Sequence, residues 1–313
     1  MRKIYYTLIL LIGFSIGLTA QETTVYYRNN NMVTKLADNP TYYIKFKSAE
    51  NGLVSYEQYC MNNVLNQKGT VQNINTLVKE GEITTFYSTG AVKDVINYVA
   101  GLPKGMKTHY FSNGNVNYTL INSSAGYGFS HEEVSSIKYL FCATPDNKVI
   151  LENGNGYFKA FNDDLSIAQE GNVKNTAADG EWKGYENNKI AFTEVYNNGQ
   201  LIKGENFESD GKVYAYAQRN KRPEPKGGIS NFYNYVASSF QDINGANTKL
   251  MMKFIVDANG KLNNVEVINP SSSNQKINAL AISAIENAPK WTPALEQGKA
   301  VQFAYYMPIS IKN

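Results

Sequence analysis

Apolar and polar residues alternate with a period of two in many short runs of this chain, most clearly between Lys249 and Asn269. The apolar residues on one face are Leu250, Met252, Phe254 and Val256 in the first run, and Val265 and Val267 in the second. The connection between the runs ends in Asn259-Gly260, a strong hairpin signal because both residue types tolerate positive φ. The stretch is therefore predicted to be a β-hairpin with one buried face.

Two stretches around this hairpin show helical spacing instead. The first contains Ile229, Phe232, Val236 and Phe240, and the second contains Ile277, Leu280, Ala281, Ala284 and Ile285. A capping box at 272–275 starts the second helix and Pro289 ends it. A last alternating run follows, with Val301, Phe303, Tyr305 and Met307 on one face. The order helix, hairpin, helix, strand predicts a small α+β sandwich with one helical layer.

One phrase recurs through the middle of the chain: an aromatic or similar residue, two small or polar residues, Gly or Asn, any residue, then an aliphatic. It begins at Tyr87, Phe111, Tyr185 and Tyr196, and more weakly at Cys60 and Glu208. Several glycines in this part are spaced by 24 residues. A hairpin of that length cannot bury its own apolar face, so neighbouring hairpins are expected to stack into a meandering sheet.

These patterns predict a mainly β chain with a C-terminal α+β domain. The expected division is a signal peptide at 1–20, an N-terminal β segment at 21–53, hairpin repeats at 54–216, a linker at 217–227 and the C-terminal domain at 228–313. The linker is assigned because it holds two prolines, a glycine followed directly by a second one at Gly228, and several basic residues, which break both periods.

The N-terminus has the layout of a secretory signal. Arg2 and Lys3 precede an apolar run, Leu8–Leu18, and small residues end at Ala20 before Gln21, the expected cleavage site. This predicts export across a membrane, and the family resemblance given below implies the periplasm or the outer membrane of a Gram-negative-type bacterium as the destination. The alternative is an uncleaved membrane anchor at residues 4–20, a span that is short for about 30 Å of hydrocarbon.

The composition mainly argues against certain classes of function. The net charge is +3 and no Lys/Arg-rich stripe is present, so nucleic acid is not expected as a partner. His109 and His131 have no metal-ligand spacing, adjacent Asp163 and Asp164 fit an exposed turn, and no nucleotide-binding or nucleophile motif occurs. We expect no catalytic residues, metal or small-molecule cofactor, and therefore no enzyme.

Cys60 and Cys142 are the two cysteines of the chain. One bridge is possible in an oxidising compartment, but sequence separation says nothing about proximity. The favoured interpretation is two unrelated buried thiols.

Two family resemblances follow from these motifs. The glycine and aromatic phrases from Tyr98 to Gly114 and from Gly180 to Gly204 resemble MORN-type repeats, which implies a spacer or interaction surface over about residues 54–216. Residues 223–312 resemble the TonB C-terminal domain family. The matching positions include Gly227, Gly228, Asp257, Gly260, Trp291, Pro293, Gly298 and Pro308.

The TonB resemblance implies a binding mode. In that family an extended segment of an outer-membrane transporter adds as a strand beside the last strand of the domain. The corresponding edge here consists of Gln302, Phe303, Ala304, Tyr305, Tyr306 and Met307. Pro308 lacks an N–H group, which fits an edge strand, although it could equally serve to blunt that edge against aggregation.

The favoured hypothesis is a non-enzymatic envelope protein that captures an extended peptide from an outer-membrane transporter or another envelope protein. Energy transducers of this family carry an anchor with a histidine and a long Pro-rich spacer, whereas this chain has 9 prolines and no histidine in its apolar run. Two alternatives stay open: an energy transducer anchored by residues 4–20, and a purely structural envelope protein. The sequence specifies no oligomeric state.

Overall fold

The computed structural model describes residues 22–28, 31–33, 39–48, 50–122, 137–240, 247–269 and 275–312. These residues form mostly β-strands, with a small α+β arrangement near the C-terminus, which confirms the predicted fold class. The chain divides into two compact units, Met1–Gly101 and Leu102–Asn313. The expected cleavage site at Ala20 and Gln21, His131 and the cap at 272–274 lie outside the described residues.

The first unit is an antiparallel sheet in the order β2-β1-β3-β4-β5-β6-β7. A short 3-10 turn, η2 (Glu50–Gly52), lies between β3 and β4. The strands are β1 (Thr23–Arg28), β2 (Asn31–Val33), β3 (Tyr42–Ser48), β4 (Val54–Cys60), β5 (Leu65–Val71), β6 (Lys79–Phe86) and β7 (Val92–Val99). Strands β1, β2 and β3 lie within residues 21–53, the segment that was expected to be β. The core side chains are Tyr27, Ile44, Phe46, Tyr56, Val71 and Ile83.

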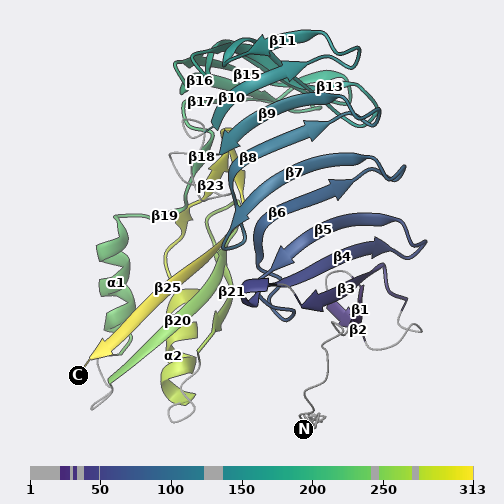
Figure 1. Ribbon diagram of the computed structural model, residues 1–313. Helices are drawn as coiled ribbons and strands as arrows, with labels where there is room; N and C mark the ends of the chain where they lie inside the picture. Colours follow the sequence, from purple (N-terminus) through teal and green to yellow (C-terminus); the bar gives the residue numbers. More distant parts are fainter. Residues whose placement is uncertain are drawn as a thin grey trace, which may run out of the picture. The chain divides into compact units, whose positions relative to one another are not determined.

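The second unit begins with a meander of antiparallel hairpins, here called the hairpin sheet, in which each strand pairs with the next. Its strands run from blue through teal to green in Figure 1. They are β8 (Leu102–Tyr110), β9 (Val116–Asn122), β10 (Ile137–Ala143), β11 (Val149–Glu152), β12 (Asn155–Phe161), β13 (Ile167–Lys174), β14 (Ala177–Glu186), β15 (Lys189–Asn197), β16 (Gln200–Phe207) and β17 (Val213–Tyr216).

Two kinds of turn recur between the described strands of both units. In the longer kind the Phe111 N–H donates to Asn115 O (2.8 Å) and the Gly114 N–H donates to Phe111 O (2.9 Å), with Gly114 at φ 86°. The same bonds recur in turns that begin at Cys60, Tyr87, Thr144, Asn162, Glu208 and Asp257. The shorter kind places two adjacent residues at positive φ, at 153–154, 175–176, 187–188 and 198–199.

The recurrent sequence phrase therefore covers both kinds of turn. The phrases at Tyr87 and Phe111 form the longer turn, but those at Tyr185 and Tyr196 end in the two-residue turn. The turn at Asn259-Gly260 also differs from the simple expectation, because Gly260 has positive φ and Asn259 does not. The Asp257 carboxylate stabilises this turn by accepting hydrogen bonds from the N–H groups of Asn259 (2.8 Å) and Lys261 (2.9 Å).

Aromatic rings that lie over glycines hold the end of the hairpin sheet together. One row of cross-strand neighbours runs over β13 to β17 and contains Gly171, Trp182, Glu194, Gly204 and Tyr216. A Cβ atom at Gly171 would overlap the Trp182 indole, and one at Gly204 would overlap the Tyr216 ring. Each ring thus fills the space above a strand that has no side chain there, which explains why glycine recurs within these strands.

The remainder of the second unit, residues 228–312, is here called the C-terminal module. Its elements are α1 (Ile229–Ser238), β20 (Asn247–Val256), β21 (Leu262–Val267), α2 (Gln275–Glu286), β22 (Trp291–Thr292), β23 (Ala294–Glu296), β24 (Lys299–Val301) and β25 (Phe303–Lys312). Strands β20, β21 and β25 form an antiparallel sheet in the order β21-β20-β25. Figure 1 shows β25 running beside β20, with α1 and α2 in the same module.

The core of the module lies between one face of that sheet and the two helices. Phe254 and Met252 from β20 are fully buried with Phe232 from α1 and Ile285 from α2. The Trp291 ring meets the rings of Phe232 and Phe254 nearly edge to face, at centroid distances of 4.9 and 5.6 Å. This burial confirms the predicted helical and alternating patterns of the module, except at Ile229, which was assigned to the apolar face of the first helix and is 41% exposed.

Residues 217–227, expected as a linker, contain two short strands. Strand β18 (Asn220–Lys221) pairs with β23, and β19 (Glu224–Pro225) pairs with β22. The segment therefore adds backbone hydrogen bonds to the C-terminal module before α1 begins.

We predict that Gly171→Ala lowers the free energy of unfolding by about 1–3 kcal/mol, because the new methyl group forces the Trp182 ring out of its position. Chemical denaturation of the full chain measures this loss. The control repeats the substitution in a Trp182→Ala background, where space above Gly171 is free. An equal loss in both backgrounds would show that contact with the ring is not the reason for glycine.

Candidate functional site

The candidate site indicated by the sequence is the outer edge of β25, the edge that points away from β20. The hydrogen-bond pattern of β20 shows which backbone groups of β25 point to that edge. In an antiparallel ladder the N–H and C=O of one residue point to the same side, and successive residues alternate. The Ile268 N–H donates to Met251 O (2.8 Å), so Met251 directs its backbone groups toward β21. Met251 is the register partner of Pro308, and Pro308 therefore directs its backbone groups away from β20, to the outer edge.

The same alternation applies along the whole of β25, because its register with β20 is continuous. Ala304 and Tyr306 direct their N–H and C=O groups to the outer edge, whereas Tyr305 and Met307 bond to β20. Among the described strands, β25 pairs with β20 alone. The outer edge of residues 303–307 is thus a row of backbone donors and acceptors that another strand could use.

The side chains of the predicted edge residues divide between two faces of the sheet. Met307 is 1% exposed and Tyr305 is half-buried against the helices, and Tyr305 stacks on Phe254 with centroids 5.5 Å apart. Tyr306 lies on the opposite face and is 57% exposed. Of the remaining residues, Phe303 is half-buried, Ala304 is exposed, and exposed Gln302 lies between β24 and β25.

At Pro308 the outer edge has fewer free backbone groups. Proline has no N–H to offer an incoming strand. Its carbonyl oxygen, on the same edge, lies 3.4 Å from the Tyr233 hydroxyl of α1, which donates to it. The edge is therefore more available before Pro308 than at Pro308 itself, and sequence reasoning did not indicate the contact from Tyr233.

The other family-motif residues lie in turns and in the core of the module. Gly227 and Gly228 have φ of 85° and 88° and form the turn before α1. Gly260 packs against the backbone of Trp291, whose N–H donates to Gly260 O (2.8 Å). A Cβ atom at Gly260 would overlap the Trp291 carbonyl oxygen, so only glycine fits there.

Three further motif residues have the same kind of role. Asp257 stabilises the hairpin turn, half-buried Pro293 lies between β22 and β23, and Gly298 has φ 78° in the turn between β23 and β24. These positions are determined by turn geometry and packing. They shape the module without lying on the β25 edge.

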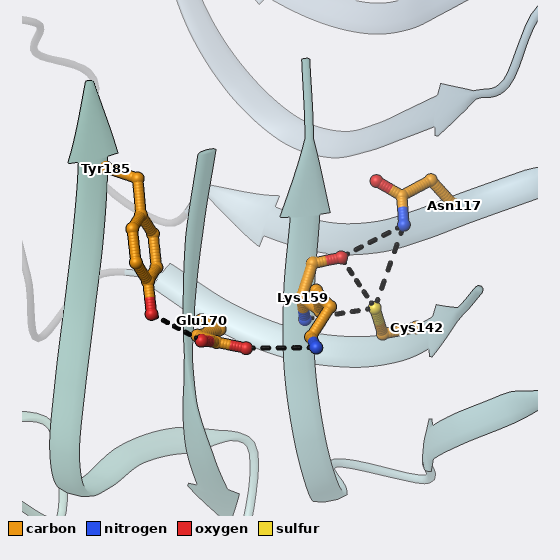
Figure 2. A network of polar contacts seen from close by, with 5 residues as sticks. All are labelled: Asn117, Cys142, Lys159, Glu170 and Tyr185. Carbon is orange, nitrogen blue, oxygen red and sulfur yellow. Dashed lines mark hydrogen bonds and ion pairs between the residues drawn. The ribbon is translucent and has the colours of Figure 1, made fainter. Parts of the chain in front are cut away.

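Figure 2 shows a polar network in the hairpin sheet, and its inner part is structural. The Asn117 side-chain amide donates to the carbonyl oxygens of Ala143 (2.9 Å) and Lys159 (3.0 Å). The Cys142 thiol donates to Lys159 O (3.2 Å) and accepts from Lys159 N–H (3.3 Å). These side chains satisfy backbone groups near the register shift of β10 at Cys142 and Ala143.

The outer part of the network is a half-buried ion pair. Glu170 accepts from the Tyr185 hydroxyl (2.6 Å) and lies 3.0 Å from the Lys159 ammonium. Burial alone raises the pKa of Glu170, but the bonds from Tyr185 and Lys159 outweigh it and hold that pKa below its ordinary value. Tyr185 correspondingly has its pKa raised to about 12 by the bond to Glu170. The group is fully paired and offers no free acid or base.

A second buried network was not predicted. The Glu194 carboxylate accepts from the hydroxyls of Tyr196 (2.8 Å) and Tyr216 (2.7 Å), and from Arg219 at Nε (2.6 Å) and Nη2 (3.0 Å). Burial raises the pKa of both tyrosines. One signal was present in the sequence: the alternation of Phe192, Glu194 and Tyr196 places a carboxylate at a core-facing position.

The remaining candidate residues for catalysis or metal binding do not form a site within the part of the chain that the structure describes. Within the described residues, no group of three or more His, Cys, Asp and Glu side chains lies close enough to hold a metal ion. Asp163 and Asp164 lie in an exposed turn, where the Ser166 hydroxyl lowers the pKa of Asp164. His109 is buried and stacks on Tyr118. Neither helix of the described chain has the length and hydrophobicity needed to cross a membrane.

The two cysteines are free thiols in different surroundings: Cys142 is buried as expected, but Cys60 is exposed. Burial raises the pKa of Cys142 to about 11, so very little thiolate is present near neutral pH.

We predict that one thiol per native chain reacts with a thiol reagent at pH 8, and that the Cys60→Ser variant does not react until it is unfolded. Titration with a chromogenic disulfide measures both. Rapid reaction of Cys142 in the native variant would contradict the buried position.

The C-terminal residues match a known family model. Residues 242–311 match the model described as Gram-negative bacterial TonB protein C-terminal. No curated protein matches the chain. The match covers β20, β21, α2 and the outer strand β25, the elements that form the edge and its support. Residues 242–311 are accordingly identified as a TonB C-terminal domain, a non-enzymatic type of domain that belongs to the Gram-negative cell envelope.

Proposed function

We propose that this chain is an envelope interaction protein whose C-terminal module binds an extended peptide as an added strand along β25. The observation that carries this proposal is the outward direction of the backbone groups of Ala304 and Tyr306 on an edge that β20 leaves open. Domains of the matched family interact with outer-membrane transporters, so an extended periplasmic segment of such a transporter is the proposed partner.

The size of the available edge limits the strength of binding. Ala304 and Tyr306 together offer two N–H donors and two C=O acceptors, each worth about 0.5–1.5 kcal/mol once exchange with water is included. The rest of the affinity must come from side chains. On the helix side a partner residue would lie beside half-buried Phe303 and Tyr305, and on the other side beside exposed Tyr306. An apolar residue is favoured next to Phe303 and Tyr305.

The alternative strand edge of the same sheet is less suited to pairing. Strand β21 has a register shift against β20, and Asn264 within it has φ 50°. Such a bulge interrupts the row of outward backbone groups. Strand β25 is regular over its whole paired length, which is why the proposal assigns binding to that edge.

We predict that Ala304→Pro weakens capture of the partner at least about tenfold while the module stays folded. The substitution removes one outward N–H and leaves the ladder with β20 intact, because Ala304 makes no backbone bond to β20. The assay is a pull-down of the full chain with peptides copied from the periplasm-facing N-terminal segments of outer-membrane transporters, followed by calorimetry of those retained.

The matched control is Ser310→Pro, which removes an outward N–H on the far side of Pro308. Binding should fall at least about tenfold in Ala304→Pro and change little in Ser310→Pro. Equal binding by wild type and Ala304→Pro contradicts strand addition at this edge. Failure of every transporter peptide to bind the wild-type chain contradicts the proposed partner class.

A further inference from the structure

We infer that the C-terminal module has a second role: it is the C-terminal cap of the hairpin sheet, and the two fold as one cooperative unit. The contacts are made by the β23–β24 hairpin of the module and by Arg219 and strand β18, which precede the module and pair with it; together they contact β15, β16 and β17. This role concerns contacts within the unit Leu102–Asn313 and does not depend on peptide binding.

The first argument is the charge inside the last hairpins. The side chain of Glu194 in β15 is 1% exposed, and Arg219 contributes two of its four hydrogen bonds. Arg219 also places its guanidinium 4.9 Å from the centre of the Phe192 ring. A buried carboxylate that loses its cation is strongly destabilising. The hairpin sheet therefore depends on a residue that follows its last strand.

The second argument is that the module holds Arg219 in place. The Gln297 N–H, in the turn between β23 and β24, donates to Arg219 O (2.6 Å). Directly after Arg219, Asn220 and Lys221 pair with Glu296 and Leu295 of β23. The position of the Arg219 side chain is thus fixed by backbone bonds to the module.

The third argument is direct contact between the β23–β24 turn and the last strands of the hairpin sheet. A Cβ atom at Gly298 would lie 3.1 Å from Ala215 O and 3.1 Å from Tyr214 Cβ, so this turn packs closely on β17. The Asn206 side-chain amide of β16 donates to the Gln297 side chain (3.0 Å). Lys299 of β24 forms an ion pair with Glu208, just after β16.

These contacts cover the last hairpins of the sheet, which have no further hairpin beside them. A terminal repeat has no further neighbour to cover its face and its strand edge, and arrays of this kind need a distinct terminal cap. Here Tyr216 ends the row of rings and glycines, and its hydroxyl bonds to Glu194 beside Arg219. The C-terminal module therefore stabilises the last hairpins and also fixes where its own β25 edge is attached.

The test uses hydrogen–deuterium exchange of the full chain, read in peptides that cover β15–β17. Ile285→Ala opens a cavity in the module core, where Ile285 is fully buried. If the module is the cap, exchange in β15–β17 rises about tenfold or more, together with exchange in α2 and β20. Ile268→Ala is the matched control, since Ile268 belongs to the same module and is 49% exposed. It should leave both regions unchanged.

Faster exchange in α2 and β20 with no change in β15–β17 would overturn the inference. Should Ile285→Ala fail to fold, Ile285→Val makes a smaller cavity and the same two regions are compared, with an expected change of about two- to tenfold. A second variant, Arg219→Leu, should raise exchange in β15–β17 and in β23–β24 at the same time. A change confined to β15–β17 contradicts coupling. Arg222→Leu, at an exposed arginine of the same segment, is its control.

Discussion

A strand at the edge of a sheet carries N–H and C=O groups without partners, and the arrangement of this chain follows from how those groups are satisfied. Near the register shift of β10, the side chains of Asn117 and Cys142 bond the backbone of Lys159. At the end of the hairpin sheet, the β23–β24 turn packs on β17. Strand β25 is treated differently, because Ala304 and Tyr306 direct their backbone groups to an outer edge with no strand beside it among those described.

A second constraint in the hairpin sheet is that certain strand positions are glycine, because an aromatic ring occupies the space where a side chain would lie. Trp182 covers Gly171, and Tyr216 covers Gly204 and reaches Glu194 on the next strand. A ring over a glycine buries apolar area without a second layer above it. The same end of the sheet therefore combines tight packing with one buried charge, and that charge connects it to the C-terminal module.

The sequence predicted those features that depend on local periodicity and turn chemistry. The alternation around Phe254 and the helical spacing around Ile285 indicated the module core correctly, because burial of one face dictates those patterns. The longer turn at Phe111 was recognised from its glycine. The MORN-type resemblance of the hairpins, the domain boundaries and the signal peptide stay predictions.

Contacts between segments far apart in the chain could not be predicted in this way. The basic segment with Arg219 looked like a solvated linker, since nothing local shows that a carboxylate 25 residues earlier is buried beside it. Tyr233 reaches Pro308 across 75 residues. Cys60 is exposed at the end of β4, where a turn begins, whereas Cys142 is buried within β10. Such contacts depend on the tertiary fold, which local sequence patterns do not specify.

The central claim is that the outer edge of residues 303–307 receives a partner strand. The most direct measurement is residue-resolved amide exchange by NMR, with and without a transporter-derived extended peptide. The account predicts that the amides of Ala304 and Tyr306 exchange quickly in the free chain and become protected with the peptide bound, while those of Tyr305 and Met307 are protected in both states. Binding of the peptide without protection of Ala304 and Tyr306 would contradict the account.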